Sequence, residues 1–358
     1  MTPFAKVATS PARAEVLPVL AAVADGQTLT TLAERLTELR ELAGSDMAET
    51  EADLATMARP ANVVAKSAHH LLDLGGKRLR PLCVALASRV GAGFSPAARH
   101  IAVAVELVHA ATLLHDDVID VGDSRRGAPT ARTLYGNAAS IYAGDWLLIE
   151  ALKRVRQAAV PGVLDKLLFV IEEMIHAEAI QLANRGKVGN GRSDYFHVVE
   201  GKTAALFRWA MYGGGRAAGL AEDECRALEG FGLHLGVAFQ AIDDLLDFTG
   251  DPATTGKASL ADLREGKLTY PLIVALEREP SILPAVREIA AAPGDTAPPP
   301  ALCKQVVDTI HKVGGYDECR KLARGRTQEA IASLSPLPAS RALTALKTVA
   351  EATLAREQ

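Results

Sequence analysis

The sequence has few aromatic residues, no closely spaced cysteines and no surplus of positive charge. Aromatic residues make up 4% of its 358 residues, and 39 Lys and Arg residues are set against 43 Asp and Glu residues. A nucleic-acid-binding chain carries a strong basic surplus, so we expect no nucleic-acid partner. The four cysteines show no CxxC spacing. This argues against a zinc site and a disulfide framework, and it favours a reducing compartment.

The chain also lacks a long uncharged apolar run. None reaches the ~18 residues that a transmembrane helix needs. The N-terminal stretch has no continuous apolar core before Arg13 and Glu15, so we expect no secretory signal and no transmembrane segment. We therefore predict a cytoplasmic protein. The remaining composition, 49% hydrophobic and 23% charged, is typical of globular proteins.

Apolar residues recur at helical spacing along nearly the whole chain. In residues 29–58, for example, leucines recur at steps of three and four, which predicts an amphipathic helix or a pair of helices. Ser95-Pro96 and Ser335-Pro336 each resemble a helix start, with a capping hydroxyl before a proline at the first helical position. No strand-turn-strand pattern is evident. We predict an all-α fold of long helices, with an N-terminal helical extension over residues 1–55 and a main domain over residues 56–358.

Two acidic clusters interrupt apolar helical segments. Each has aspartates at positions i, i+1 and i+4: Asp116, Asp117 and Asp120 in the first, and Asp243, Asp244 and Asp247 in the second. One such cluster alone is more simply explained as a helix end or an exposed turn, but two copies in apolar helix argue against coincidence. Buried carboxylates without partners cost several kcal/mol, and a hard divalent cation removes that cost. Mg²⁺ rarely has a cage of protein ligands only, so substrate phosphates are the expected further ligands.

Four basic segments are candidates to bind those phosphates. Lys77, Arg78 and Arg80 follow two glycines, and Arg125 and Arg126 follow the first acidic cluster; Lys202 and Thr203 form a third segment, and Lys257 and Lys267 a fourth. Each has a simpler alternative, such as solvated charges after a glycine C-cap, a local salt bridge or a surface lysine. None has the spacing of a nucleotide-binding P-loop.

Metal cages beside basic groups suit a reaction with a diphosphate leaving group. Metal ions and cationic side chains stabilise the charge that develops on that group. Abundant Ala, Leu and Val with few aromatics suit an apolar pocket for a hydrocarbon substrate. No Ser-His-Asp set or redox motif stands out.

These motifs together resemble the trans-isoprenyl diphosphate synthase (polyprenyl synthetase) family. The resemblance rests on GGKRLRP, ELVHAATLLHDDVID, RRG, GKTAALF, FQAIDDLLD and GK…EGKLTYP, in the family's order, and covers residues 60–358. It implies the isoprenoid synthase fold, with long helices around a central cavity, in an enzyme that is usually a homodimer. It also implies a transferase that condenses isopentenyl diphosphate head-to-tail onto an allylic diphosphate, with several Mg²⁺ ions per active site.

The resemblance also assigns roles to residues. It implies that the first aspartate cluster binds Mg²⁺ with the allylic diphosphate and that the second binds the remaining Mg²⁺. The residues that match the isopentenyl diphosphate site are Lys77, Arg80, His109 and Arg126. Those that match contacts to the allylic diphosphate are Arg125, Lys202, Lys257 and Lys267, while Thr203 and Gln240 match groups whose oxygens face the allylic carbocation. Without the family, His109 is best explained as a core histidine.

Small residues before the first aspartate predict a long product. In the family, bulky aromatics four or five positions before that aspartate block the product tunnel; here those positions hold Thr112 and Ala111, with Val108 a further turn back. By analogy we predict an octaprenyl-like product of about thirty to fifty carbons, of the kind used for quinone side chains and delivered to a membrane.

Three alternatives stay open at this point. The chain resembles shorter-chain geranylgeranyl or farnesyl diphosphate synthases as well. A class I terpene cyclase would release a cyclic hydrocarbon without consuming isopentenyl diphosphate, and the second aspartate cluster argues against it. A non-catalytic subunit that regulates a synthase is a third alternative, although such subunits tend to lose aspartates and this chain has all six.

Overall fold

A computed structural model describes residues 30–187, 191–249, 260–291 and 298–355. Lys257, one of the predicted allylic diphosphate contacts, lies outside these residues. The described helices are, in chain order, α2 (Thr30–Ala55), α3 (Val63–Asp73), α4 (Leu79–Val90), α5 (Pro96–Ile119), α6 (Ala131–Tyr135), α7 (Asn137–Ala158), α8 (Val163–Asn184), α9 (Arg192–Val199), η1 (Glu200–Ala204), α10 (Ala205–Ala217), α11 (Glu222–Thr249), α13 (Ala261–Arg264), α14 (Tyr270–Arg278), η2 (Pro280–Ile282), α15 (Leu283–Ala291), α16 (Pro300–Lys312), α17 (Gly315–Ser333) and α18 (Arg341–Ala355).

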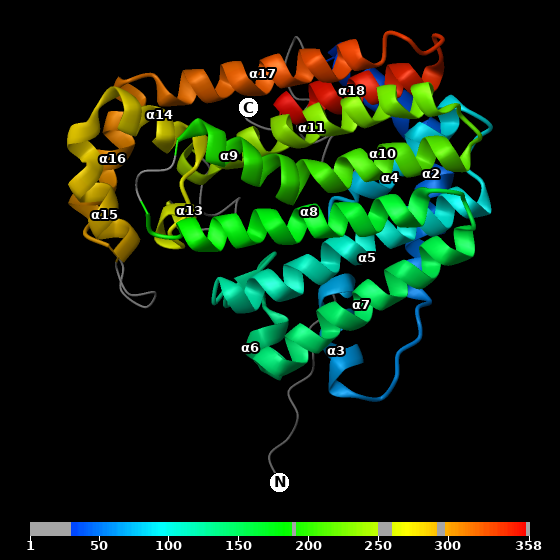
Figure 1. Ribbon diagram of the computed structural model, residues 1–358, viewed down its shortest axis with the longest axis horizontal. Coiled ribbons are helices and arrows are strands. Elements are labelled where there is room, and N and C mark those ends of the chain that lie inside the picture. Colours follow the sequence, from blue (N-terminus) through cyan, green and yellow to red (C-terminus); the bar gives the residue numbers. More distant parts are fainter. Residues whose placement is uncertain (1–29, 188–190, 250–259, 292–297, 356–358) are drawn as a thin grey trace.

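The predicted all-α fold is confirmed. Helices α5, α8, α10, α11 and α17 run across the molecule in stacked layers, as Figure 1 shows, while the shorter α13 to α16 close one end. Helix α5 packs along α7 and against α4 and α10, and α11 packs between α10 and α17. The aspartate clusters lie on α5 and α11, so both belong to long helices of the main bundle.

Helix α5 is a core helix that begins where the sequence predicts. The Ser95 hydroxyl accepts a hydrogen bond from the Ala98 N–H, and Pro96 occupies the first helical position. Of the described helices, α5 is the one whose length and apolar character would allow it to cross a membrane, and 67% of its most apolar stretch is buried inside the protein. That degree of burial is what the central helix of a bundle has.

The second predicted helix start is wrong. Ser335 and Pro336 form a turn after α17, and α18 begins only at Arg341. The cap of α18 is Ser340, whose hydroxyl accepts a hydrogen bond from the Leu343 N–H. Proline after a helix end is common because it cannot continue the helix, and here it takes that role.

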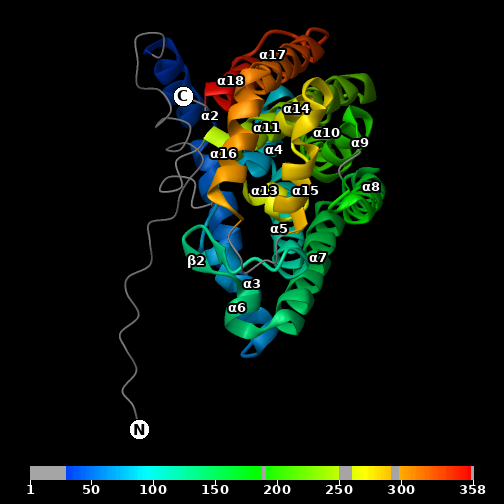
Figure 2. The same ribbon diagram turned by 90° about the vertical axis from the view of Figure 1, so that its left-hand side faces the viewer.

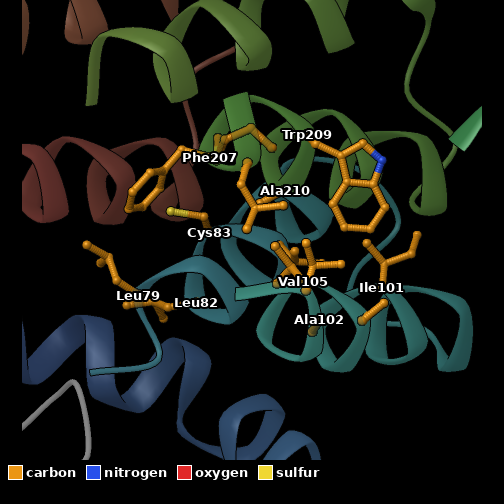
Figure 3. Packing of buried hydrophobic residues seen from close by; sticks show 14 of the residues in the cluster. Leu79, Leu82, Cys83, Ile101, Ala102, Val105, Phe207, Trp209 and Ala210 are labelled. Carbon is orange, nitrogen blue, oxygen red and sulfur yellow. The ribbon is translucent and has the colours of Figure 1, made fainter. Parts of the chain in front are cut away.

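The main core lies where α4, α5 and α10 meet (Figure 3). Figure 3 shows Leu82 of α4 and Ile101 of α5 beneath Phe207 and Trp209 of α10, and all four are fully buried. The Trp209 indole N–H donates to the Val163 carbonyl at 3.0 Å, which satisfies its one polar group. A side chain at Gly214 would place its Cβ 2.5 Å from the Val84 carbonyl oxygen, so only glycine lets α10 approach α4 this closely.

Helix α2 forms one continuous helix along the outside of this core. It is seen at the edge of the bundle in Figure 2. Leu36 and Leu39 are buried in the same cluster as the core residues of α4 and α5, in agreement with the predicted leucine spacing. Arg35 pairs with Glu351 of α18 at 2.5 Å. The division after residue 55 stays a prediction.

A short β-hairpin follows α5, although the sequence shows no strand pattern. Strands β1 (Ser124–Arg125) and β2 (Ala128–Pro129) pair antiparallel, with Arg125 opposite Ala128. The two turn residues, Arg126 and Gly127, both have positive φ, at 54° and 73°. A tight hairpin turn needs this conformation at both central positions. Strands of two residues are too short to produce an alternating pattern, which explains why the sequence does not reveal them.

Candidate active site

The first acidic cluster lies at the C-terminal end of α5. Asp116 and Asp117 are in its last turn and Asp120 is its C-cap residue. The Asp117 side chain is 3% exposed and accepts hydrogen bonds from Arg125 Nε at 2.9 Å and Nη2 at 2.8 Å. Burial raises the pKa of Asp117 above its usual range, and the guanidinium of Arg125 partly offsets that rise.

The other two carboxylates of this cluster face lysines from distant elements. The Asp116 carboxylate lies 3.6 Å from Lys202 Nζ. The Asp120 carboxylate lies 2.7 Å from Lys267 Nζ. Lys202 also contacts Glu178 at 2.5 Å. These pairs draw η1, α8 and the loop before α14 towards the end of α5.

The second acidic cluster lies near the end of α11. Asp244 is nearly fully buried and accepts hydrogen bonds from Gln240 Nε2 at 2.9 Å and from the Tyr270 N–H at 3.0 Å. Burial raises the pKa of Asp244 to about 7, against the opposing effect of its hydrogen bonds. Asp247 is 7% exposed and Asp243 is partly buried.

A short π-helix, η1, places Lys202 and Thr203 between the two clusters. Such single π turns occur often at functional sites. Thr203 Oγ1 donates to Gln240 Oε1 at 2.9 Å, while Lys202 faces Asp116. The close approach depends on Gly236, because a Cβ there would lie 2.5 Å from Ala204 Cα. Residues 202–203 and 267–270 therefore each join the end of α5 to the end of α11.

A cavity of about 170 Å³ opens between these elements. Its lining combines charged, polar and apolar side chains, among them five of the residues predicted from the sequence: Lys202, Thr203, Gln240, Asp244 and Lys267. A small adjoining cavity shares Gln181 and Lys267 with it and includes Asp120. One aspartate of each cluster therefore lines a cavity, Asp244 the larger and Asp120 the smaller, and Lys267 lies in the wall of both.

The donor set suits a hard divalent cation that shares its ligands with a substrate. Among the described residues, no three Asp, Glu, His or Cys side chains are close enough to hold an ion on their own. Mg²⁺ usually takes one or two carboxylates together with phosphate oxygens and water, so a complete protein cage is not required. Carboxylates one turn apart on α5, beside Lys202 and Lys267, fit that pattern.

The basic residues form a second site at the start of α4. Arg80 and Arg126 make no ion pair or hydrogen bond with any residue that the structure describes, and Arg80 Nε is buried. The Arg80 guanidinium lies 4.5 Å above the Phe207 ring. Burial lowers the pKa of both arginines. Since such unpaired guanidinium groups are costly in a protein interior, this site favours an anionic ligand.

The hairpin turn brings Arg126 to this site. Its guanidinium lies against Gly76, where an added Cβ would be only 3.0 Å from Nη2. Positive φ at a non-glycine residue is rare and is often found where function requires it. The His70 ring nitrogen Nε2 lies 2.8 Å from the Pro129 carbonyl oxygen and so links α3 to the base of the hairpin.

His109 lies near the arginines of this second site. Burial lowers its pKa well below the usual range, and the positive charges of Arg80 and Arg126 lower it further. A neutral imidazole can donate one hydrogen bond to a phosphate oxygen. Lys77 completes the group, with Nζ 5.9 Å from the centre of the Phe239 ring.

Two residues of α8 and its C-cap residue, Arg185, were not predicted from the sequence. Glu178 pairs with Lys202, Gln181 lines both cavities, and Arg185 lies 3.6 Å from Asp120 while donating to the Ile119 and Glu265 carbonyls. Their spacing of three and four residues places them on one helix face. That periodicity is a signal in the sequence, but exposed helices of soluble proteins show the same polar spacing.

The predicted chain-length residues lie on α5 below the acidic cluster. Val108 and Ala111 are 1% and 2% exposed and belong to the main core. Thr112 is partly buried, and its hydroxyl donates to the His109 carbonyl at 2.8 Å. None of the three is aromatic, so the wall of α5 is lined with small side chains at this depth.

Comparisons with known proteins agree with this arrangement. The polyprenyl synthetase family model matches residues 61–298. The chain is 33% identical over 304 residues to octaprenyl diphosphate synthase of Escherichia coli (strain K12), covering 85% of this chain and 93% of that protein. It is 34% identical to heptaprenyl diphosphate synthase component 2 of Geobacillus stearothermophilus, covering 80% and 87%. A polyprenyl synthase from Caulobacter crescentus CB15, solved in complex with calcium and isoprenyl diphosphate, superimposes with a TM-score of 0.83 at 32% identity, over 90% of this chain and 97% of that one.

Proposed function

The chain is a member of the polyprenyl synthetase family, and from that premise we propose how its two charged sites divide the reaction. The protein is a prenyltransferase of isoprenoid biosynthesis that extends an allylic diphosphate with isopentenyl diphosphate to a long-chain polyprenyl diphosphate. We assign the allylic diphosphate to the acidic site and isopentenyl diphosphate to the arginine site. The observation that carries this assignment is that Arg80 and Arg126 have no carboxylate partner among the described residues, whereas the lysines of the acidic site do.

At the acidic site, Lys202 and Lys267 would turn from their aspartates to the allylic diphosphate, and Arg125 would follow from Asp117. Family members generally use Mg²⁺, and here Asp116, Asp117 and Asp120, with Asp243, Asp244 and Asp247, would hold it. When bound, the metal supplies positive charge that stabilises the departing diphosphate. Lys257, which lies outside the described residues, belongs to this set by resemblance.

Thr203 and Gln240 would stabilise the allylic carbocation. Their oxygens lie 2.9 Å apart in the wall of the cavity, where the hydroxyl and amide dipoles can turn towards positive charge. The apolar core beside them excludes water from the cation. The double bond of isopentenyl diphosphate would then attack the cation and form the new carbon–carbon bond. The released diphosphate would take the proton that is lost from the carbon next to this bond, so no side-chain base is required.

At the arginine site, Lys77, Arg80, His109 and Arg126 would bind the diphosphate of isopentenyl diphosphate. Arginine forks match phosphate oxygens in pairs, and the neutral imidazole of His109 adds one donor. The Phe207 and Phe239 rings, 5.7 Å apart, form an apolar shelf beneath Arg80 and Lys77. The bound diphosphate would supply the negative charge that the arginines otherwise lack.

The product tunnel would run along α5 past Thr112, Ala111 and Val108. Mass analysis of the products formed from farnesyl diphosphate with excess isopentenyl diphosphate and Mg²⁺ tests the long-chain assignment, and we expect about thirty to fifty carbons. Ala111→Phe adds an aromatic ring to the proposed tunnel wall, and we expect it to shorten the main product; because Ala111 is buried, circular dichroism should first show that the variant is folded. An unchanged product length in a folded Ala111→Phe variant would exclude this tunnel.

We also propose a homodimer through α7 and α8. These neighbouring helices carry large apolar side chains that are more than half exposed, namely Tyr142, Ile149, Phe169, Ile175 and Leu182. Contiguous exposed apolar surface on a soluble protein usually marks an interface. Light scattering should give twice the monomer mass, and Phe169→Glu with Ile175→Glu should give the monomer; a monomeric wild type would refute the dimer.

We further propose a cytoplasmic enzyme whose product, used for quinone side chains, passes to a membrane.

A further inference from the structure

The reaction as assigned leaves out one buried arginine next to the isopentenyl diphosphate site. Arg78 lies in the chain between Lys77 and Arg80, but its side chain is only 5% exposed and points away from theirs, towards two carboxylates. Arg78 Nε contacts Glu51 of α2 at 2.6 Å. Arg78 Nη1 contacts Glu106 of α5 at 2.5 Å. One guanidinium therefore joins α2, α4 and α5.

The backbone at Arg78 is held in an unusual conformation. Its φ of 48° and ψ of 30° lie in the left-handed region, directly before α4 begins at Leu79. A residue with a Cβ rarely adopts this conformation unless its surroundings hold it there. The left-handed turn lets Lys77 and Arg80 face the two phenylalanine rings while Arg78 faces α2. The ion pairs of Arg78 thus fix the direction of its neighbours.

Glu106 extends the same network beneath the phosphate-binding groups. Its side chain is 5% exposed and lies one helical turn before His109 on α5. The Glu106 charge raises the pKa of Arg80 and of Arg126, against the effect of burial. A buried carboxylate at this place balances part of the positive charge that Arg78, Arg80 and Arg126 bring together.

We propose that Arg78, Glu51 and Glu106 form a positioning network for the isopentenyl diphosphate site, and that helix α2 sets the affinity for this substrate through Glu51. The proposal rests on the assignment of Lys77, Arg80, His109 and Arg126 to isopentenyl diphosphate. Arg78 itself does not touch the substrate. Its effect reaches the diphosphate through the orientation of Lys77 and Arg80.

The chain offers a matched control on the same pair of helices. Asp46 of α2 accepts hydrogen bonds from Arg89 of α4 at 2.5 Å and 2.7 Å, so this pair also ties α2 to α4. Arg89 lies near the opposite end of α4 from Lys77 and Arg80. Loss of either ion pair weakens the packing of α2 on α4, but only the loss of the Glu51 pair disturbs Lys77 and Arg80.

The experiment compares Glu51→Gln with Asp46→Asn in the full-length enzyme. We expect Glu51→Gln to raise the KM for isopentenyl diphosphate about fivefold, and to leave kcat and the KM for farnesyl diphosphate within about twofold. Asp46→Asn should lower the melting temperature about as much as Glu51→Gln does, and it should leave the KM values for both substrates unchanged. Equal KM changes for the two substrates, or equal effects of the two variants, would show that Glu51 has a structural role only.

Two further variants separate this inference from the site assignment. Lys77→Ala should raise the KM for isopentenyl diphosphate; an unchanged KM would reject the site. A raised KM in Lys77→Ala together with an unchanged KM in Glu51→Gln would reject the positioning role alone. Arg78→Lys keeps the charge but loses the fork that spans both carboxylates. We expect its KM for isopentenyl diphosphate to exceed that of Glu51→Gln, and a KM equal to the wild type's would also overturn the proposal.

Discussion

At the end of α5, each of the three carboxylates has a lysine or arginine partner, whereas near the start of α4 Arg80 and Arg126 lie close together without an ion-pair partner among the described residues. The acidic site is balanced by side chains from four separate segments. The charges of Arg80 and Arg126 are not paired by any side chain in the part of the chain that the structure describes. Both belong to one proposed active site. The chain itself supplies the opposite charges at the acidic site, whereas a ligand would supply them at the arginine site.

The difference follows from what each site has to exchange. Asp116 and Asp120 are 19% and 16% exposed, so their ion pairs with Lys202 and Lys267 are mostly buried. A diphosphate bound with Mg²⁺ would give each lysine a new anion and each carboxylate a new cation, so the exchange would leave no buried charge unpaired. Arg80 and Arg126 have nothing to release and are arranged in advance, so the diphosphate itself completes their surroundings.

The largest effect that tests this comparison is expected at Asp116. Asp116→Asn removes a carboxylate oxygen donor and a negative charge, so kcat should fall by about a thousandfold because the departing diphosphate loses its stabilisation. Incorporation of labelled isopentenyl diphosphate measures it. Asp145→Asn is the matched control, because Asp145 is 58% exposed and contacts only the nearby His115 among the described residues. Its kcat should stay within about twofold of wild type, and a similar kcat in both variants would contradict the acidic site.

A smaller and more selective effect is expected at Arg126. Arg126→Gln removes one of the two unpaired guanidinium groups, and a charged hydrogen bond to phosphate is worth about tenfold to a hundredfold in binding. The KM for isopentenyl diphosphate should rise by that factor, while the KM for the allylic substrate should not change. Steady-state kinetics with each substrate varied in turn decides the matter. A larger change in the allylic KM would reverse the assignment of the two sites.

The smallest effect is expected in the stability of the metal-free enzyme. The folded pKa of Asp244, about 7, lies above its ordinary value of 3.8. Between these values the folded state keeps a proton that the unfolded state loses, so stability should decrease as pH rises, by about 1.4 kcal/mol per pH unit. Melting in EDTA between pH 5 and pH 7 measures this slope.

The same melting series contains its own controls. Asp244→Asn should flatten the slope in EDTA, since no proton is then exchanged at this position. Mg²⁺ added with diphosphate should flatten it for the wild type, because a bound metal ion favours the ionised carboxylate. A slope that is the same in the variant and the wild type would show that another group titrates.

Much of the site could be predicted from the sequence because its motifs are local. The two aspartate triplets, Gly76 before Lys77, and Ser95 before α5 each act within one or two helical turns. The start proposed at Ser335 was wrong because the same dipeptide fits the end of one helix and the beginning of another. The hairpin around Arg126 was not predicted because two-residue strands carry no pattern.

Other features depend on contacts between distant segments. Arg185 reaches Asp120 from the end of α8, Gln181 lines the cavity from the same helix, and Asp244 accepts a hydrogen bond from the Tyr270 N–H, 26 residues away in the chain. Glu51 is an ordinary charged residue of an amphipathic helix until α4 places Arg78 beside it. No single segment contains the information that pairs them.

The sequence by itself determined the helical class, the two acidic clusters and the basic residues that follow each of them, because helix periodicity and residue chemistry are properties of short stretches. The tertiary structure alone decided which charges are neutralised. Arg125 forms an ion pair with Asp117, and Arg78 forms ion pairs with Glu51 and Glu106. Arg80 and Arg126 have no such partner among the described residues, so they can pair with a ligand. Charge balance depends on distance and burial in space, and the order of residues along the chain fixes neither.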